Sequence, residues 1–200
     1  MTHSESRTAG RRIDGHPLAE VPSRAVVAVG VLMALWCAGF AAISVWFELT
    51  DYFGTGRYAD DEAAFSVVIW FVTVLKLLGL VLAVLAVQAR LFAPRIVGAL
   101  LWAAFATLTV YVVGSITQAV VMLAGIAGDA DQVDARSVAY VLAFVLAAAG
   151  FGILATSHAR RAGLGTRIKV IGACGAPIAL ASVLVIVPAI LRAVGLLSAS

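Results

Sequence analysis

Charged side chains are scarce in this chain of 200 residues. Only 12% of its residues are Asp, Glu, Lys or Arg, whereas 62% are hydrophobic, and the mean hydropathy is +1.04. Soluble domains contain about 45–50% apolar residues. The composition therefore excludes a soluble protein. It predicts an integral membrane protein whose apolar surface is largely in contact with lipid.

Cysteine and histidine are also rare. Cys37 and Cys174 lie in separate apolar stretches and form no CxxC pattern, so a thiol–disulfide enzyme is not indicated. His3, His16 and His158 offer no intramembrane pair for a haem. The ordered Asp motifs of membrane-embedded prenyl and alcohol-phosphate transferases are missing as well. The sequence therefore predicts no cofactor, no metal site and no catalytic residue.

Long apolar stretches occupy most of the chain, at about 25–47, 65–87, 96–124, 137–156 and 170–191. Each can cross the hydrocarbon core of a bilayer, which is roughly 30 Å thick and takes about 20 residues of helix. The stretches are continuously apolar, whereas the strands of a membrane barrel alternate. The predicted fold class is therefore all-α, a polytopic integral membrane protein with five transmembrane helices in one domain, residues 24–197. Residues 1–23 are polar and are expected to form a disordered cytoplasmic tail.

Basic residues are concentrated on alternate connecting segments. One set of segments holds Arg7, Arg11, Arg12, Arg24, Arg90, Arg95, Arg160, Arg161, Arg167 and Lys169, and the opposite set holds only Arg57, Arg136 and Arg192. Because positive residues mark the cytoplasmic side, the N-terminus is predicted to be cytoplasmic and the C-terminus external. The pI near 9.2 reflects this topology and does not indicate nucleic-acid binding. The abundant Ala, Val, Gly and Arg suggest a GC-rich bacterial genome, and hence a multi-pass protein of a bacterial inner or plasma membrane.

One lysine lies near the middle of the second apolar stretch. Lys76 is about ten residues from either end of Val67–Val87, or ~15 Å at about 1.5 Å per residue. A charge at that depth costs roughly 2.5–3.5 kcal/mol on insertion scales, so an intramembrane lysine is a functional-site hypothesis. It could carry a proton, or anchor an anionic substrate or lipid. The alternative is a lysine that is satisfied by carbonyl and hydroxyl oxygens and holds helices together.

Polar residues of the third stretch could supply those oxygens, because they recur every three or four residues and so share one helical face. They are Thr107, Tyr111, Ser115 and Gln118. The second and third stretches are joined by a short turn around 89–94 and are expected to be antiparallel neighbours. Counting from that turn places Tyr111 at the depth of Lys76, so we predict a contact between them. With Thr73, on the same face as Lys76, these residues form the candidate intramembrane polar site.

The segments predicted to be external are acidic. The first carries Glu48, Asp51, Asp60, Asp61 and Glu62, and the second carries Asp129, Asp131 and Asp134. Carboxylates in this number could bind a divalent cation, or serve an external-face enzyme that acts on lipid-linked substrates. The alternative is that acidic residues are simply tolerated on that side. On the opposite side, the basic cluster from His158 to Lys169 could bind anionic lipid headgroups or act only as an orientation signal.

Two functional hypotheses remain, and no motif ties the sequence to a named family. The first is a non-enzymatic accessory, assembly or lipid-interacting component of the membrane. The second is a small transporter or channel-like module that uses Lys76 and the polar face of the third stretch. In either case the expected partners are membrane lipids and a possible second copy or other membrane proteins.

Overall fold

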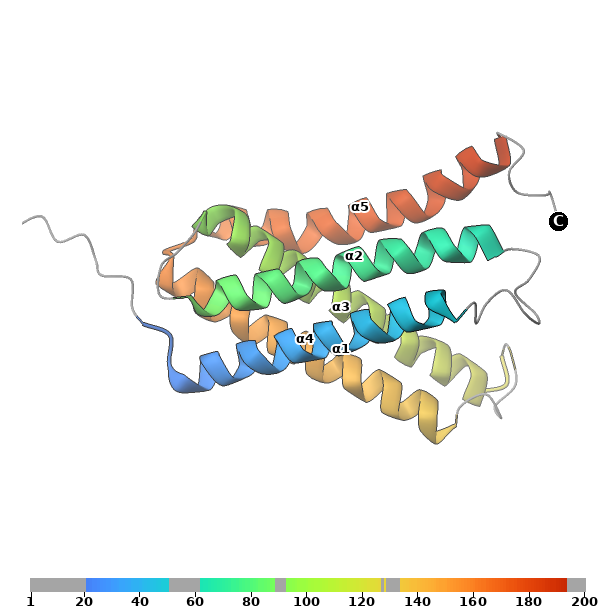
Figure 1. Ribbon diagram of the computed structural model, residues 1–200, viewed down its shortest axis with the longest axis horizontal. Helices are drawn as coiled ribbons and strands as arrows, with labels where there is room; N and C mark the ends of the chain where they lie inside the picture. The colour runs from blue at the N-terminus through green and yellow to red at the C-terminus, as the bar shows by residue number, and fades with distance from the viewer. Residues whose placement is uncertain (1–20, 51–61, 89–92, 127, 129–133, 194–200) are drawn as a thin grey trace, which may run out of the picture.

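The computed structural model describes residues 21–50, 62–88, 93–126, 128 and 134–193. Within these ranges the chain is all-helical, with no strand: α1 is Arg24–Leu49, α2 is Glu62–Val87, α3 is Pro94–Leu123, α4 is Ala135–Arg161 and α5 is Thr166–Ala193. Each expected span falls on one of these helices, with boundaries that differ by five residues at most. Figure 1 shows the helices running side by side along the length of the molecule.

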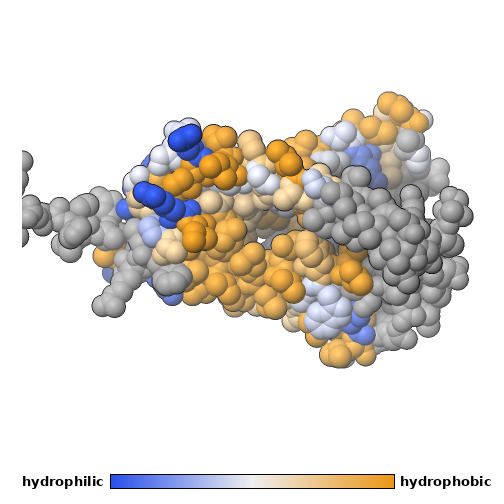
Figure 2. Space-filling model, turned by 90° about the horizontal axis from the view of Figure 1, so that it is seen from above, coloured by the Kyte–Doolittle hydropathy of each residue, from blue (hydrophilic) through white to orange (hydrophobic). Residues whose placement is uncertain are grey.

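Four of the helices in the described ranges are long and apolar enough to cross a membrane: α1, α2 over Val67–Val87, α3 and α4. This is the character of a multi-pass membrane protein. Figure 2 shows hydrophobic residues over the middle of the visible face and hydrophilic residues toward its two ends. The predicted tail falls outside the described residues except for 21–23.

The ends of the helices follow from local sequence. The Asp134 side chain caps α4 by accepting a hydrogen bond of 2.7 Å from the Ser137 N–H, and Pro94 begins α3, where a missing N–H does no harm. α4 ends at Arg161. Two residues further on, Gly163 has a φ of 59° that favours glycine, and the Leu164 N–H then donates back to the Ala159 carbonyl at 3.0 Å. The chain therefore reverses between α4 and α5 within a few residues.

We call the end where α1 begins the proximal end and the end where α1 ends the distal end. The most extensive contacts are α1 with α2, α3 with α5, and α3 with α4. α4 also packs on α1, whereas α2 makes only slight contact with α4 and with α3. α4 therefore joins an α1–α2 pair to an α3–α5 pair. Figure 1 shows α4 and α5 separating toward the distal end.

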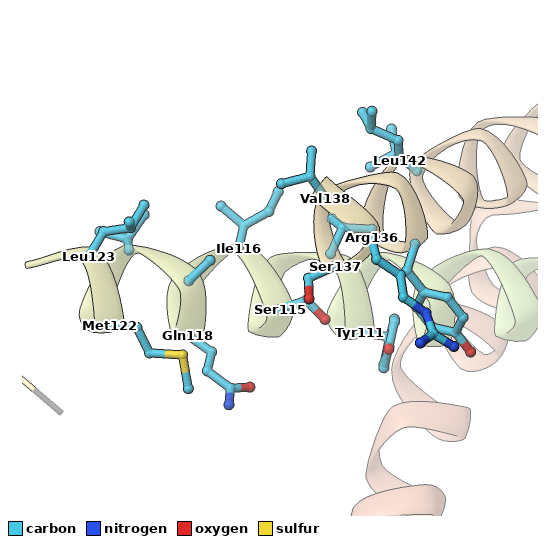
Figure 3. Close-up of a pocket in the computed structure, with 15 residues that line it drawn as sticks. Tyr111, Ser115, Ile116, Gln118, Met122, Leu123, Arg136, Ser137, Val138 and Leu142 are labelled. Carbon is cyan, nitrogen blue, oxygen red and sulfur yellow. The ribbon is translucent and has the colours of Figure 1, made fainter. Parts of the chain in front are cut away.

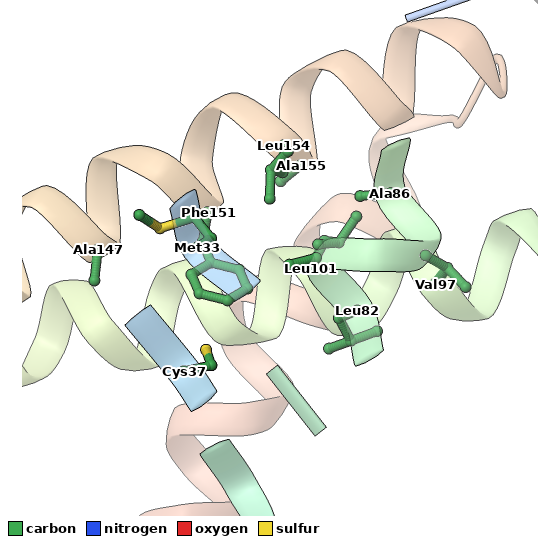
Figure 4. Packing of buried hydrophobic residues seen from close by; sticks show 11 residues of the cluster. Met33, Cys37, Leu82, Ala86, Val97, Leu101, Ala147, Phe151, Leu154 and Ala155 are labelled. Atoms are coloured by element: carbon green, nitrogen blue, oxygen red, sulfur yellow. The ribbon is translucent and has the colours of Figure 1, made fainter. Parts of the chain in front are cut away.

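The buried apolar cluster draws on four helices and lies toward the proximal end. Figure 4 shows how its side chains pack. Its members are Met33, Cys37, Leu82, Ala83, Ala86, Val97, Leu101, Ala147, Phe151, Leu154 and Ala155. Four of these are alanines, and Gly150 adds a further small residue beside Met33. Apolar burial alone does not drive helices together in lipid, so close contact depends on such small side chains.

Replacing Gly172 of α5 by Ala should weaken the packing of α5 on α3. The added Cβ would collide with the Ala99 carbonyl oxygen and lie 2.9 Å from the Trp102 Cβ. Overpacking of this kind costs about 1–3 kcal/mol. Gly175, about one turn further along α5, has nothing within 4 Å of an added Cβ, so Gly175→Ala is the matched control. Thermal unfolding in detergent measures both variants, and equal midpoints would contradict this packing.

Candidate functional site

The ammonium group of Lys76 is bound by α1. Its Nζ donates to the Ser44 Oγ at 2.6 Å and to the Phe40 carbonyl oxygen at 3.2 Å. The Ser44 hydroxyl in turn donates to the same Phe40 carbonyl at 3.0 Å, so three polar groups close a small ring of hydrogen bonds. The Phe40 aromatic ring also lies 5.7 Å from Nζ, within range of a cation–π contact. The half-buried lysine is therefore satisfied by a neighbouring helix.

The sequence explains why α1 and α2 approach so closely beside this lysine. Phe40 and Ser44 are four residues apart and so lie on one face of α1. Gly79 follows Lys76 by about one turn on α2, and a Cβ there would lie 3.1 Å from the Cys37 Sγ and 3.5 Å from the Phe151 Cζ. The missing side chain at position 79 lets α1 and α4 come near α2 just proximal of the lysine.

The predicted contact between Lys76 and Tyr111 is not formed, so that prediction was wrong. The Tyr111 ring packs on Phe144 of α4, with centroids 4.6 Å apart, and the Tyr111 side chain is 45% exposed. The short connection between α2 and α3 brings only their proximal ends together. Further along, α4 lies between them, with Phe151 against Gly79 of α2 and Phe144 against Tyr111 of α3.

The other residues of the candidate polar site are divided between separate places. Thr73 is buried, and its hydroxyl donates to the Ile69 carbonyl of its own helix at 2.7 Å. Thr107 is half-buried within α3. Ser115 and Gln118 line a groove together with Tyr111. The structure therefore brings three of the six residues together, but not around Lys76.

This groove, which we call the α3–α4 groove, runs between the distal halves of α3 and α4 and has a volume of about 700 Å³ (Figure 3). Its lining is mostly apolar. The polar residues along it are Tyr111, Ser115, Gln118, Arg136, Ser137 and Tyr140. No pattern in the sequence predicts this groove, because it depends on the separation of two helices.

Aromatic side chains separate Lys76 from the α3–α4 groove. The Phe40 ring, which covers the lysine, packs edge-on against Phe144 and Tyr140, with centroids 5.8 and 5.9 Å apart. Phe144 then packs on Tyr111, which lines the groove. The Phe40 and Phe144 rings, which offer no side-chain hydroxyl or amide to a passing ion, therefore lie between Lys76 and the groove, whereas Tyr140 lines the groove itself.

A second polar cluster lies at the proximal end, where sequence reasoning expected lipid binding or an orientation signal. The Arg161 guanidinium donates to the carbonyl oxygens of Ala86 and Gln88 at the end of α2, the latter at 3.3 Å. His158, one turn earlier on α4, is fully buried, and its Nε2 lies 3.2 Å from the Pro94 carbonyl oxygen at the start of α3. We call these two residues the proximal clamp. Because the final carbonyls of a helix lack partners in their own helix, a cation there is stabilising.

The carboxylates of the predicted acidic segments are mostly outside the described residues. Asp51, Asp60, Asp61, Asp129 and Asp131 all belong to this group. In the described part of the chain, no three His, Cys, Asp or Glu residues are placed to hold a metal ion. The hypotheses that depend on these carboxylates stay untested.

Comparison with known proteins identifies no relative. No family model, no curated protein and no solved structure matches the chain.

Replacing Ser44 by Ala should destabilise the protein by about 1–3 kcal/mol, because it removes an acceptor from a half-buried ammonium group. The loss should vanish when position 76 is already Met, since the amine is then gone. The double-mutant cycle of Ser44→Ala and Lys76→Met therefore predicts a strong, non-additive coupling. Ser182→Ala is the control, because that hydroxyl donates only to the Ile178 carbonyl of its own helix. Additive effects in the cycle, measured by unfolding in detergent, would show that the contact contributes nothing.

Replacing Arg161 by Ala should lower stability by about 2 kcal/mol, because the carbonyls of Ala86 and Gln88 lose their charged donor. The neighbouring Arg160 is exposed, so Arg160→Ala removes the same charge without touching α2 and should be nearly neutral. Unfolding midpoints of the two variants in one detergent provide the comparison. If Arg160→Ala proved as damaging as Arg161→Ala, the effect would be one of net charge at this end.

Proposed function

We propose that this chain is a non-enzymatic, multi-pass membrane protein, an accessory, assembly or lipid-interacting component, in which Lys76 fastens α1 to α2. The observation that carries the proposal is the pair of hydrogen bonds from the Lys76 ammonium to Ser44 and Phe40. A lysine that binds a substrate must direct the N–H donors of its ammonium group toward that substrate. Here the donors face a neighbouring helix, and an aromatic ring covers the amine.

The proposed topology has five spans, with the proximal end in the cytoplasm of a bacterial cell. α5 has 28 residues, which corresponds to about 42 Å of helix and exceeds the roughly 30 Å that a span requires. The proximal end carries the basic residues Arg24, Arg95, Arg160, Arg161, Arg167 and Lys169. Positive residues on one side of the bundle support a cytoplasmic proximal end.

A transport pathway that uses Lys76 together with the polar face of α3 would need both in one cavity. Instead, the rings of Phe40 and Phe144 lie between Lys76 and the α3–α4 groove. This separation favours the fastening role over the transport alternative. An external-face enzyme would need the acidic segments to converge, and no contact among the described residues supports that idea.

Water accessibility around Lys76 tests the proposal. In a Cys37→Ala, Cys174→Ala background, single cysteines are placed at Thr73, beside the lysine, and at Thr50, which is exposed at the distal end. Intact cells are then treated from outside with a membrane-impermeant thiol reagent. We expect labelling at position 50 and protection at position 73, because the lysine side of α2 is sealed by α1.

Three readouts keep this experiment decisive. Labelling of the position-73 cysteine after denaturation confirms that the thiol is present and reactive. Labelling at position 73 in intact cells would show an aqueous path to mid-membrane and overturn the fastening role. Protection at position 50 until the cells are broken would instead reverse the proposed orientation.

A further inference from the structure

We propose that the α3–α4 groove binds one glycerophospholipid from the leaflet at the distal end, with the lipid phosphate at Arg136 and an acyl chain along the groove. This inference rests on the proposed function, in that it takes the helices as embedded in lipid, and it names the ligand of a lipid-interacting component. Its site is separate from Lys76 and from the proximal clamp.

The depth of the groove matches one leaflet. Along α4 the lining runs from Arg136 to Val145, nine residues and therefore about 14 Å of helix. Half of a hydrocarbon core roughly 30 Å thick is about 15 Å. The groove thus extends from the membrane surface to near the midplane, the distance that one acyl chain covers. Its volume of about 700 Å³ also falls within the range of about 300–1,000 Å³ that is usual for ligand sites.

The polar groups of the groove lie at the levels where a phospholipid is polar. Arg136 is the second residue of α4 and stands at the distal surface, where lipid phosphates lie. Gln118 precedes the end of α3 by five residues, or about 7 Å, a depth that suits the ester groups. Val141 and Val145 follow below, and they are apolar like an acyl chain.

Arg136 is available for a phosphate. In the described part of the chain its guanidinium forms no ion pair, and it is exposed. The nearby carboxylate of Asp134 is occupied by the Ser137 N–H at 2.7 Å and the Ser137 hydroxyl at 2.6 Å. These hydrogen bonds, with a smaller contribution from the nearby positive charge of Arg136, hold the pKa of Asp134 below its usual range. A guanidinium binds phosphate oxygens through two parallel hydrogen bonds, so it is well suited to a phosphodiester.

Gln118 and Ser115 line the groove with polar side chains, which argues against an occupant that is only hydrocarbon. Neither side chain has a hydrogen-bond partner among the described residues. Polar groups that face pure hydrocarbon are unfavourable. A phospholipid supplies ester carbonyls that can accept hydrogen bonds from these side chains, whereas a bare alkyl chain does not.

Native mass spectrometry of the delipidated protein in detergent tests the site with two probes, phosphatidylglycerol and a diacylglycerol with the same acyl chains. We expect the wild-type protein to bind one phosphatidylglycerol and to bind diacylglycerol at least about tenfold more weakly, because the phosphate contact is missing. Arg136→Gln should weaken phosphatidylglycerol binding by a similar factor. Arg95→Gln removes an exposed arginine at the proximal end and should leave this binding unchanged.

A second pair of variants tests the apolar part of the site. Ala119 lines the groove, so Ala119→Leu should fill it and abolish retention of the lipid. Ala139 is exposed on α4 and does not line the groove, so Ala139→Leu is the matched control. Circular dichroism confirms that each variant keeps its helices.

Three results would overturn the inference. They are no binding of added phosphatidylglycerol by the wild-type protein, equal binding of the two probes, and a lipid-free dimer that Ala119→Leu dissociates, which would make a second copy the occupant. None of these affects the labelling at positions 50 and 73. The lipid site can therefore fail while the fastening role of Lys76 stands, and the reverse also holds.

Discussion

A polar group in an apolar bilayer is costly without a hydrogen-bond partner, and this constraint determines where the helices are joined. Lys76 takes its partners from α1, and Arg161 supplies donors to the end of α2. Hydroxyls such as those of Thr73 and Thr109 donate to the preceding turn of their own helix. Each polar side chain with a partner on another helix thus marks a junction. Between these junctions the contacts are apolar.

The distribution of small residues accounts for the shape of the bundle. Alanines and glycines are concentrated where α1, α2, α3 and α4 meet toward the proximal end, and there the backbones approach closely. Toward the distal end α3 and α4 carry larger side chains at their facing positions, including Tyr111, Tyr140 and Phe144. The rings hold these helices apart and leave the α3–α4 groove. A tight proximal half and an open distal half therefore follow from the same principle of packing.

The sequence predicted the helices well and their neighbours poorly. The length of an apolar stretch can be read from the local sequence, so all five helices were predicted close to their observed bounds. The partner of Lys76 is a tertiary property, and a short connection between α2 and α3 constrained only their proximal ends. The packing of Phe151 against α2 and of Phe144 against α3 has no local signal. The contact of Arg161 with α2 did have a local signal in the sequence. Arg161 is a basic residue in the last turn of α4, from where it can reach carbonyl oxygens at the end of another helix. An orientation signal and a structural contact were not exclusive.

The proximal clamp also has a consequence for the order in which the bundle can be completed. Arg161 follows its acceptors Gln88 and Ala86 by 73 and 75 residues along the chain. During synthesis the final carbonyls of α2 therefore lack the Arg161 donor until α3 and α4 have left the ribosome. A nascent chain that ends after α3 contains α2 but lacks both residues of the clamp. The first three helices are thus an unfinished unit, and the arrival of α4 is the step that closes it.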